Sequence, residues 1–342
     1  MSGAFERAEL ARHRHDTLPA HLEVIRAIEH VVADNLNLLA PRATAWQPAD
    51  FLPDLDSASW RDELERFRQA AETVSDQLLV VLVGDMVTEE ALPSYSMSLN
   101  SLVRDEDGDG AAPWPRWLRG WTAEENRHGD LLNAYLRLTG RVHMRAVERT
   151  VHSLIASGFN PNTQADPYNL LVYTSFQERA TRISHGNVGR MAAKEGDRNL
   201  ARICGVIAGD EARHETFYTR MMGQVLQHDA AGGILAFRSM LRDTITMPGR
   251  FMDDGKDPDL FDHFAVVAQR ANVYTVRDYA SIIEHLVKVW DIAGRAVSGD
   301  AARAQEELCH QAERYGRLAE RTAAAMAKQP HRSFSWIRDR TV

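Results

Sequence analysis

The hydrophobic residues of this chain recur with the period of an α-helix along almost its whole length. Between Leu18 and Leu39, apolar residues are spaced three and four apart, which is the pattern of an amphipathic helix. The same spacing predicts further helices over residues 60–74, 77–102, 117–139, 144–155, 168–193, 200–226, 233–245, 260–271, 278–297 and 301–327. Glycine and proline residues separate these segments, and alternating β-branched runs that would indicate strands are missing. The pattern therefore predicts an all-α fold.

Composition and charge narrow the class of protein further. The chain has 342 residues and a formal net charge of −8, which suits a globular protein and disfavours nucleic acid as a partner. Its longest aliphatic run, Leu78 to Val83, is far too short to span a bilayer. The segment from Met1 to Ala20 has no apolar stretch of the kind found in signal peptides. We therefore expect a cytoplasmic protein without a membrane span.

The chain reads as one domain. Its two cysteines are too few for a disulfide framework or for a four-cysteine metal cluster. No linker or low-complexity segment divides the predicted helices, although the length alone would allow two domains. We expect a single domain over residues 1–342, with about the first 15 residues flexible, as chain termini often are.

The candidate chemistry lies in glutamates and histidines. The pattern Glu-x-x-His occurs three times, and a single occurrence in a chain of this composition is expected by chance. Two of the three, however, are each preceded on a separate predicted helix by an isolated glutamate. The resulting order along the chain is Glu89, Glu125 with His128, Glu178, and Glu211 with His214. This is the order that a dinuclear carboxylate site in a four-helix bundle requires, and its oxygen and nitrogen donors favour iron or manganese.

Other interpretations compete with this one. Glu125 and Glu178 each follow a Thr or Ser by three residues, so both could belong to capping boxes at helix starts. The apolar periodicity continues through both positions, which favours helix interiors. The third pair, Glu307 and His310, has no isolated glutamate to match it and lies in a highly charged segment, so we interpret it as a solvated helix face.

Pro93 predicts a distortion next to the first candidate ligand. A proline inside a helix clashes with the carbonyl group four residues before it, which here belongs to Glu89. We expect the helix to kink at this point, and our hypothesis is that the kink helps to direct Glu89 toward the metals.

The residues around these positions resemble the soluble acyl-acyl carrier protein desaturases. The resemblance runs from about residue 20 to the end of the chain. The segments around the candidate ligands are Val83-Gly-Asp-Met-Val-Thr-Glu89-Glu-Ala-Leu-Pro93, Trp121-Thr-Ala-Glu-Glu125-Asn-Arg-His128, Thr174-Ser-Phe-Gln-Glu178-Arg-Ala-Thr181 and Asp210-Glu211-Ala-Arg-His214-Glu215. Further similar segments are Trp46-Gln-Pro-Ala-Asp-Phe-Leu-Pro53, Ile183-Ser-His185-Gly-Asn187, Leu260-Phe-Asp262-His-Phe264 and Phe334-Ser-Trp-Ile337.

The resemblance implies a ferritin-like four-helix bundle enlarged by additional helices, and a homodimer. It also implies an enzyme in which two iron ions use O2 and two electrons to insert a cis double bond into a fatty acyl chain. That chain is carried on acyl carrier protein, and the electrons come from a ferredoxin-type donor. An oxygenase or hydroxylase that acts on a bound acyl chain at the same metal site is the alternative enzyme. A protein that stores iron or binds the carrier without turnover is the alternative outside enzymes.

The resemblance also assigns roles to residues outside the six ligands. Thr181 corresponds to a threonine that faces the oxygen-activating site, although a helix hydroxyl that bonds back to its own helix would explain this residue equally well. Trp46, His128 and Asp210 would lie on the path by which electrons enter. Asp210 can also orient an imidazole, because it immediately precedes a ligand.

The acyl chain would need a dry tunnel beside the metals, with its polar carrier outside. Candidate wall residues are Met97, Leu102, Pro161, Leu170 and Leu171. Leu170-Leu171 replaces a Gly-Phe pair of the plant members, so chain length and double-bond position stay open. Arg242-Asp243-Thr244 likewise replaces a basic Arg-Lys-Lys run. A basic entrance for the acidic carrier is still expected, but the sequence does not indicate which arginines form it.

Overall fold

The computed structural model describes residues 18–103, 105, 107–163, 165–242, 244–326 and 328–342. The prediction of a flexible N-terminus falls on residues outside this part of the chain. The described chain is helical almost throughout, which confirms the all-α prediction. The α-helices are α2 (Leu18–Ala27), α3 (Glu29–Asn35), α4 (Trp60–Glu72), α5 (Asp76–Glu89), α6 (Leu92–Val103), α7 (Pro113–Thr139), α8 (Met144–Ser157), α9 (Pro167–Glu195), α10 (Arg198–His228), α11 (Ala230–Arg242), α12 (Leu260–Arg270), α13 (Val276–Val289) and α14 (Gly299–Met326).

Short elements complete the fold. The 3-10 helices are η1 (Leu36–Leu38), η2 (Pro48–Phe51), η3 (Pro248–Phe251) and η4 (Ser335–Ile337). Near the C-terminus, β1 (Ser333–Phe334) and β2 (Arg340–Thr341) form a small antiparallel pair in which Ser333 lies opposite Thr341. Within the described residues, no helix combines the length and the apolar character needed to cross a membrane.

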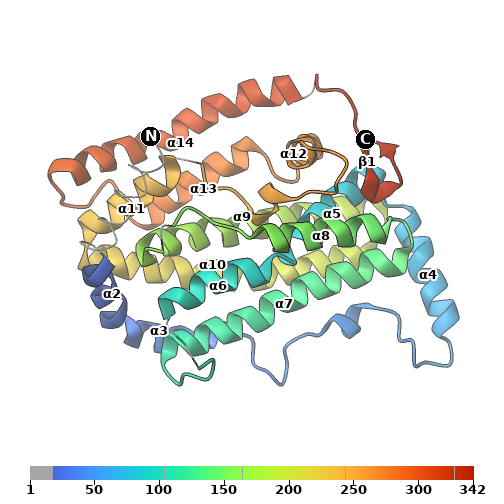
Figure 1. Ribbon diagram of the computed structural model, residues 1–342, viewed down its shortest axis with the longest axis horizontal. Coiled ribbons are helices and arrows are strands. Elements are labelled where there is room, and N and C mark those ends of the chain that lie inside the picture. Colours follow the sequence, from blue (N-terminus) through green and yellow to red (C-terminus); the bar gives the residue numbers. More distant parts are fainter. Residues whose placement is uncertain (1–17, 104, 106, 164, 243, 327) are drawn as a thin grey trace.

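Four long segments, α5, α7, α9 and α10, form the centre of the molecule, as in ferritin-like bundles (Figure 1). Every residue of α5 from Leu78 to Glu89 is buried, which explains the aliphatic run in the sequence. Helices α9 and α10 pack along their length because Gly196, with a φ of 103°, ends α9 and allows the chain to reverse. Helices α11 to α14 cover one side of the bundle, and α2 and α3 lie at one end (Figure 1).

The apolar core is divided into two clusters by a polar layer. Along α7, Trp117 and Trp121 belong to one cluster, and Leu131 and Tyr135 belong to the other. Helices α9 and α10 show the same division, with apolar residues on either side of Glu178 and of Glu211 to His214. The candidate ligands therefore lie in the middle of the bundle, surrounded along its axis by apolar packing.

The predicted helix over residues 77–102 is two helices. Helix α5 ends at Glu89, residues 90 and 91 form a turn, and α6 begins at Leu92. Pro93 is the second residue of α6, where its missing N–H costs no helical hydrogen bond. The predicted distortion next to Glu89 is therefore confirmed, and it is a complete break. The predicted helix from Leu18 to Leu39 is likewise divided, into α2, α3 and η1.

One glycine of α5 allows a close helix contact. The ring of Phe264 from α12 lies where a Cβ atom on Gly84 would be, with the nearest ring carbon 2.0 Å from that position. A side chain at residue 84 would force the Phe264 ring out of this position.

Candidate metal centre

The fold brings the six predicted ligands together from four helices. Two groups of side chains have potential ligand atoms that all lie within 4.8 Å of one another. One group contains Glu89 and His128, the other contains Glu178 and His214, and both contain Glu125 and Glu211. All six residues are buried. The two shared carboxylates are what a site for two ions needs, because each can bridge both positions.

The two imidazoles present the same nitrogen to the cluster. Nε2 of His128 lies 3.3 Å from Asp210 Oδ2, and Nε2 of His214 lies 3.1 Å from Glu124 Oε2. The Nδ1 atoms point the other way, 3.2 Å from Glu211 Oε1 for His128 and 2.8 Å from Glu125 Oε1 for His214. The carboxylates fix each ring with its Nδ1 toward the cluster.

Several buried atoms of the cluster have no hydrogen-bond partner. Nδ1 of His128 and of His214, Oε1 of Glu125 and Oε1 of Glu211 are all in this state: the nitrogens lie 3.2 and 2.8 Å from a carboxylate oxygen, but without the geometry of a hydrogen bond. Buried polar atoms are normally hydrogen-bonded, so this group of ligand atoms fits the binding of cations between them. The donor set of carboxylate oxygens and imidazole nitrogens fits two hard or borderline cations such as iron or manganese. These residues therefore fit a dinuclear metal site.

The electrostatics of the protein without metal point to the same conclusion. Burial and the neighbouring carboxylate of Glu125 raise the pKa of Glu178 well above its usual value. Burial also acts to raise the pKa of Glu89, but contacts with His128 and His185 outweigh it and hold the pKa at about 2. Four carboxylates crowded in a buried site repel one another, and cations between them remove that repulsion.

The structure places two predicted residues next to His128. Trp46 donates from Nε1 to Asp210 Oδ2 over 3.1 Å, and its ring stacks on the His128 ring at a centroid distance of 6.0 Å. Trp46 is partly exposed, whereas Asp210 and His128 are buried. Hydrogen bonds with His128 hold the pKa of Asp210 at about 2 despite its burial. The three side chains thus form a continuous contact from the surface to the cluster.

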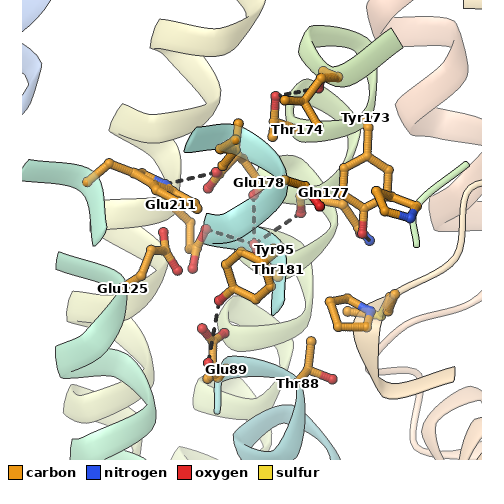
Figure 2. A pocket seen from close by; sticks show the side chains of 17 residues that line it. Thr88, Glu89, Tyr95, Glu125, Tyr173, Thr174, Gln177, Glu178, Thr181 and Glu211 are labelled. Atoms are coloured by element: carbon orange, nitrogen blue, oxygen red, sulfur yellow. Dashed lines mark hydrogen bonds between the residues drawn. The ribbon is translucent and has the colours of Figure 1, made fainter. Parts of the chain in front are cut away.

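Thr181 contacts both the cluster and its own helix. Its Oγ1 lies 2.8 Å from Glu211 Oε2, and it also lies 3.1 Å from the carbonyl oxygens of Gln177 and Glu178 in its own helix. Because a hydroxyl has only one proton, these acceptors compete for it. Figure 2 shows Thr181 among the carboxylates of the cluster.

The cluster opens onto an apolar cavity. Glu89, Glu125, Glu178 and Glu211 lie on one side of it and Tyr173 on another (Figure 2). A second apolar cavity adjoins it, and Leu99 and Leu170 line both. Apolar space therefore lies beside the carboxylates on both sides of these two leucines.

Some of the residues predicted to form the tunnel wall line the cavities, and others do not. Pro161 and Leu170 line the first cavity, and Leu171 lines the second. The prediction for Met97 is wrong, because its side chain is 74% exposed. Leu99 lines the cavity instead, and because Met97 lies two residues, or about 200°, away on the same helix α6, its side chain faces solvent. The side chain of Leu102 lies outside the described residues.

The positions of the glutamates in their helices decide between the metal-ligand interpretation and the other interpretations. Glu125 and Glu178 lie in the interiors of α7 and α9, so the capping-box interpretation is wrong. The side chain of Glu307 is 62% exposed on α14 and lies 3.9 Å from Arg238. The third Glu-x-x-His pair is therefore a surface pair, as predicted.

Sequence reasoning missed several residues that hold the cluster. Glu124 bonds His214, Arg213 bonds Glu124 over 2.7 Å, and Trp121 donates to Glu178 Oε1 over 3.1 Å. A repeated pattern in the sequence could have identified Glu124 and Arg213. It consists of an acidic residue followed by Glu, any residue, Arg and His. It occurs at residues 124–128 and again at 210–214. The acidic residue of each copy contacts the histidine of the other copy.

A second buried group supports Glu89. His185 Nε2 lies 2.8 Å from Glu89 Oε1, and the neighbouring Ser184 donates to Asp85 over 3.0 Å. Burial raises the pKa of Asp85 to about 6. His185 stood in a segment that carries the family resemblance, but its contact with Glu89 depends on the packing of α5 against α9.

Comparison with known proteins gives one consistent result. A family model described as "Fatty acid desaturase" matches residues 20–338. A chloroplastic stearoyl-[acyl-carrier-protein] 9-desaturase 5 of Oryza sativa subsp. japonica is 50% identical over 333 residues, which cover 96% of this chain and 85% of that protein. The corresponding enzyme of Gossypium hirsutum is 49% identical over 333 residues, covering 96% and 84%.

A solved structure agrees in fold. An X-ray structure described as that of "putative acyl-ACP desaturase DesA2 from Mycobacterium tuberculosis H37Rv" superposes with a TM-score of 0.53. It is 19% identical and covers 84% of this chain and 99% of its own. At this identity the likeness concerns the fold alone.

Proposed function

This chain belongs to the fatty acid desaturase family, and from that premise we propose that it inserts a cis double bond into a fatty acyl chain carried on acyl carrier protein, using O2 and two iron ions. The observation that carries the proposal is the position of the apolar cavity. The same space is lined by the four candidate carboxylate ligands and by apolar side chains such as Leu99 and Leu170. A long alkyl chain in this space lies directly against the metal site.

We propose that the six residues hold two iron ions, with Glu125 and Glu211 shared between them. The buried oxygen and nitrogen donors without partners support this assignment. When bound, an iron pair supplies the activation of O2 that the removal of hydrogen from an unactivated methylene group requires.

The protein itself supplies binding, orientation and the exclusion of water. The walls of the cavity beside the cluster are mostly apolar, so they bind an alkyl chain and keep water from the reacting carbons. Glu124 and Asp210 keep both imidazoles oriented, so the ligand atoms are in place before the substrate enters. Thr181 holds a hydroxyl proton next to Glu211 Oε2 at the edge of the cavity.

We propose that electrons come from a ferredoxin-type donor that docks near Trp46. The supporting observation is the contact from Trp46 through Asp210 to His128, which joins a partly exposed ring to a candidate ligand.

The curated relatives are named for an acyl chain carried on acyl carrier protein, and we propose the same substrate class and a homodimer for this chain. The position of the double bond depends on how the chain extends past Leu170.

An aerobic turnover assay with acyl carrier substrates of several chain lengths tests the proposal. A reducing system and ferredoxin supply the electrons, and mass spectrometry identifies the product. Loss of two hydrogens supports desaturation, whereas gain of an oxygen atom shows an oxygenase and contradicts it. No product from any substrate, with iron bound and the reducing system active, also contradicts it.

Two ligand variants and a matched control extend this assay. Glu178→Ala and His214→Ala remove proposed ligands, so we expect each to lose activity and to bind less iron. The control is the double variant Glu148→Ala and His152→Ala, which removes the same residue types from exposed positions on α8. It should retain both activity and iron. Full activity of the Glu178 variant would overturn the ligand assignment.

A further inference from the structure

Three of the seven tryptophans of this chain lie on one face of α7. Trp114, Trp117 and Trp121 are spaced three and four residues apart, which places them on the same side of the helix over roughly 10 Å. Helix α7 begins beside α3 at one end of the molecule and runs through the middle of the bundle (Figure 1). Trp114 is partly exposed, whereas Trp117 and Trp121 are buried. This tryptophan row therefore leads from the surface into the molecule.

Aromatic side chains of α10 join the three tryptophans into one continuous contact. The ring of Phe217 stacks on Trp117 at a centroid distance of 3.4 Å, and it meets Trp114 edge-on at 5.9 Å. The ring of Tyr218 lies 6.0 Å from Trp117 and also 6.0 Å from Trp121. These are ordinary distances for aromatic rings in contact. Each step along the tryptophan row therefore passes between touching rings.

The inner end of the row reaches the metal site. Trp121 donates from Nε1 to Glu178 Oε1 over 3.1 Å, and its ring lies 6.3 Å from the His214 ring. Glu178 and His214 are proposed ligands of one metal position. The contact that starts at Trp46 ends instead at His128, which belongs to the other position. The tryptophan row is thus a second contact between the surface and the cluster, separate from the first.

The tryptophans are the groups in this contact that can carry an electron. Indole and phenol rings are oxidised far more easily than the ring of phenylalanine, but a phenol must lose its proton as it loses an electron. The hydroxyl of Tyr218 is buried and has no hydrogen-bond partner among the described residues, so no acceptor is in place for that proton. An indole can lose an electron and keep its N–H proton. Phe217 and Tyr218 therefore fill the space between the carriers.

The row also forms part of the wall of both apolar cavities. Trp121 lines the cavity beside the cluster, and Trp114 and Trp117 line the second cavity. An acyl chain in this space lies against the metal site and supplies the two hydrogen atoms that desaturation removes. When no chain is present, the indole of Trp121 remains as an oxidisable group in contact with a proposed ligand.

On the basis of the proposed function, we propose that the tryptophan row carries electrons from the surface to the metal site when O2 is consumed without an acyl chain. Reduction of O2 to two water molecules takes four electrons and four protons. The donor supplies two of the electrons, and in desaturation the acyl chain supplies the other two. Without the chain, Trp121 gives up an electron to the site, Trp117 replaces it, and Trp114 replaces that one in turn.

A small thiol in solution restores Trp114 at the surface. Two thiols form one disulfide and release two electrons and two protons, and solvent supplies the remaining protons for the two water molecules. The oxidising power of O2 is thereby spent on an expendable reductant outside the protein, and the ligands and the cavity wall are spared.

The test follows oxidation of the row while O2 is consumed without acyl carrier. The iron-loaded full-length enzyme receives O2, ferredoxin and a thiol-free reducing system, and catalase and superoxide dismutase remove oxidants that diffuse through solution. Peptide mass spectrometry measures oxygen addition at each tryptophan per O2 consumed, with and without a small thiol. Trp117→Phe interrupts the row. The matched control is Trp290→Phe, the same change at an equally buried tryptophan that contacts Phe237.

In wild type we expect oxygen addition at Trp114 that the thiol suppresses. In Trp117→Phe it should fall by about 10-fold per O2 consumed, which needs a barrier only ~1.4 kcal/mol higher at the interrupted step. Addition at Trp121 should rise in the same variant, and the thiol should no longer protect it. Trp290→Phe should match wild type. Trp114→Phe changes the partly exposed end of the row, so it places less demand on folding, and it should also abolish protection by the thiol.

Other outcomes overturn the proposal. Equal oxygen addition at Trp114 in wild type and Trp117→Phe would show that the oxidant reaches the surface without the row. Equal changes in Trp117→Phe and Trp290→Phe would show an effect of core packing. Desaturation of an acyl carrier substrate is measured on the same wild-type preparation, so either result together with product formation rejects the row alone. If wild type forms no product and consumes no O2, the proposed function is rejected together with the row.

Discussion

Glu124 and His214 meet across the bundle, with Glu124 Oε2 3.1 Å from His214 Nε2. Glu124 lies on α7 and His214 on α10, and the reverse contact joins Asp210 of α10 to His128 of α7. Each of these helices therefore carries one imidazole of the site and orients the imidazole of the other. Arg213 bonds both acidic residues, at 2.7 Å from Glu124 and 2.8 Å from Asp210, which joins the two contacts into one network.

Removing the Glu124 carboxylate should weaken metal binding without disturbing the fold. In Glu124→Ala, His214 loses the partner that fixes its ring, and we expect the metal affinity to fall by about 10- to 100-fold. Glu124→Gln keeps an acceptor oxygen and should lose less. Competition titration with a chelator measures the affinity. The control is Glu90→Gln, which also changes a glutamate next to a ligand but bonds Asn133 instead. Wild-type affinity in Glu124→Ala would contradict the prediction.

Trp46→Phe should slow reduction of the metal site by a protein donor. The substitution keeps an aromatic ring but removes the Nε1 donor that bonds Asp210. We expect reduction by ferredoxin to slow by roughly 10-fold, while reduction by a small chemical reductant changes little. Stopped-flow absorbance without O2 measures both rates, with Trp60→Phe as a control on the remote α4. Equal slowing with both reductants would show that Trp46 acts on the site itself rather than on electron entry.

Leu170→Ala should change which acyl chains the enzyme prefers. Leu170 lines both cavities, so its truncation removes a side chain that lies between them and enlarges the apolar space. We expect the ratio of kcat/KM for longer over shorter chains to rise by about 10-fold, the usual effect of adding or removing a methylene-sized volume. The ratio of the two kcat/KM values is measured rather than either value alone, because truncating a buried leucine also lowers stability by about 2 to 5 kcal/mol and so affects both substrates.

Met97→Ala is the matched control for chain preference. Met97 was expected in the same wall but is exposed, so the ratio should stay that of wild type. A wild-type ratio in the Leu170 variant, measured with intact iron content, would show that the two cavities do not share the acyl chain.

Asp85→Asn should change how the stability of the metal-free protein depends on pH. Asp85 has a pKa near 3.8 when unfolded and about 6 when folded, because burial disfavours its charge. Between these values the unfolded state binds fewer protons, so wild-type stability falls as the pH rises. A shift of about two pKa units corresponds to roughly 3 kcal/mol. The stability of the variant relative to wild type should therefore increase by about this amount from pH 4 to pH 6 and then level off.

Denaturant unfolding at several pH values, after treatment with a chelator, checks this prediction. Asp254→Asn provides a control of opposite sign, because a hydrogen bond from Ser335 helps to lower the pKa of Asp254 in spite of its burial. Wild type should exceed that variant by a constant amount above pH 5, and this advantage should shrink only below about pH 4. If the difference in stability between Asp85→Asn and wild type does not vary with pH, the raised pKa of Asp85 in the folded protein is contradicted.

The local patterns of the sequence predicted the helices and the order of the ligands. Helical periodicity and the i,i+3 spacing of Glu125 with His128 are properties of short segments, so they can be read without knowing how the segments pack. The position of Pro93 likewise predicted a kink next to Glu89, where the structure has a complete break, because the effect of a proline is confined to one turn. The prediction for Met97 failed because the face of α6 that is buried depends on how this helix packs against its neighbours.

The remaining features depend on contacts between segments far apart in the chain. The sequence alone determined an all-α fold with the family's pattern of carboxylates and histidines, because period and spacing are local. Only the tertiary structure decided that Glu124 orients His214, that His185 supports Glu89, and that aromatic rings of α10 join the tryptophans of α7. Each of these contacts joins residues on different helices, and their relative placement is fixed by how the helices pack.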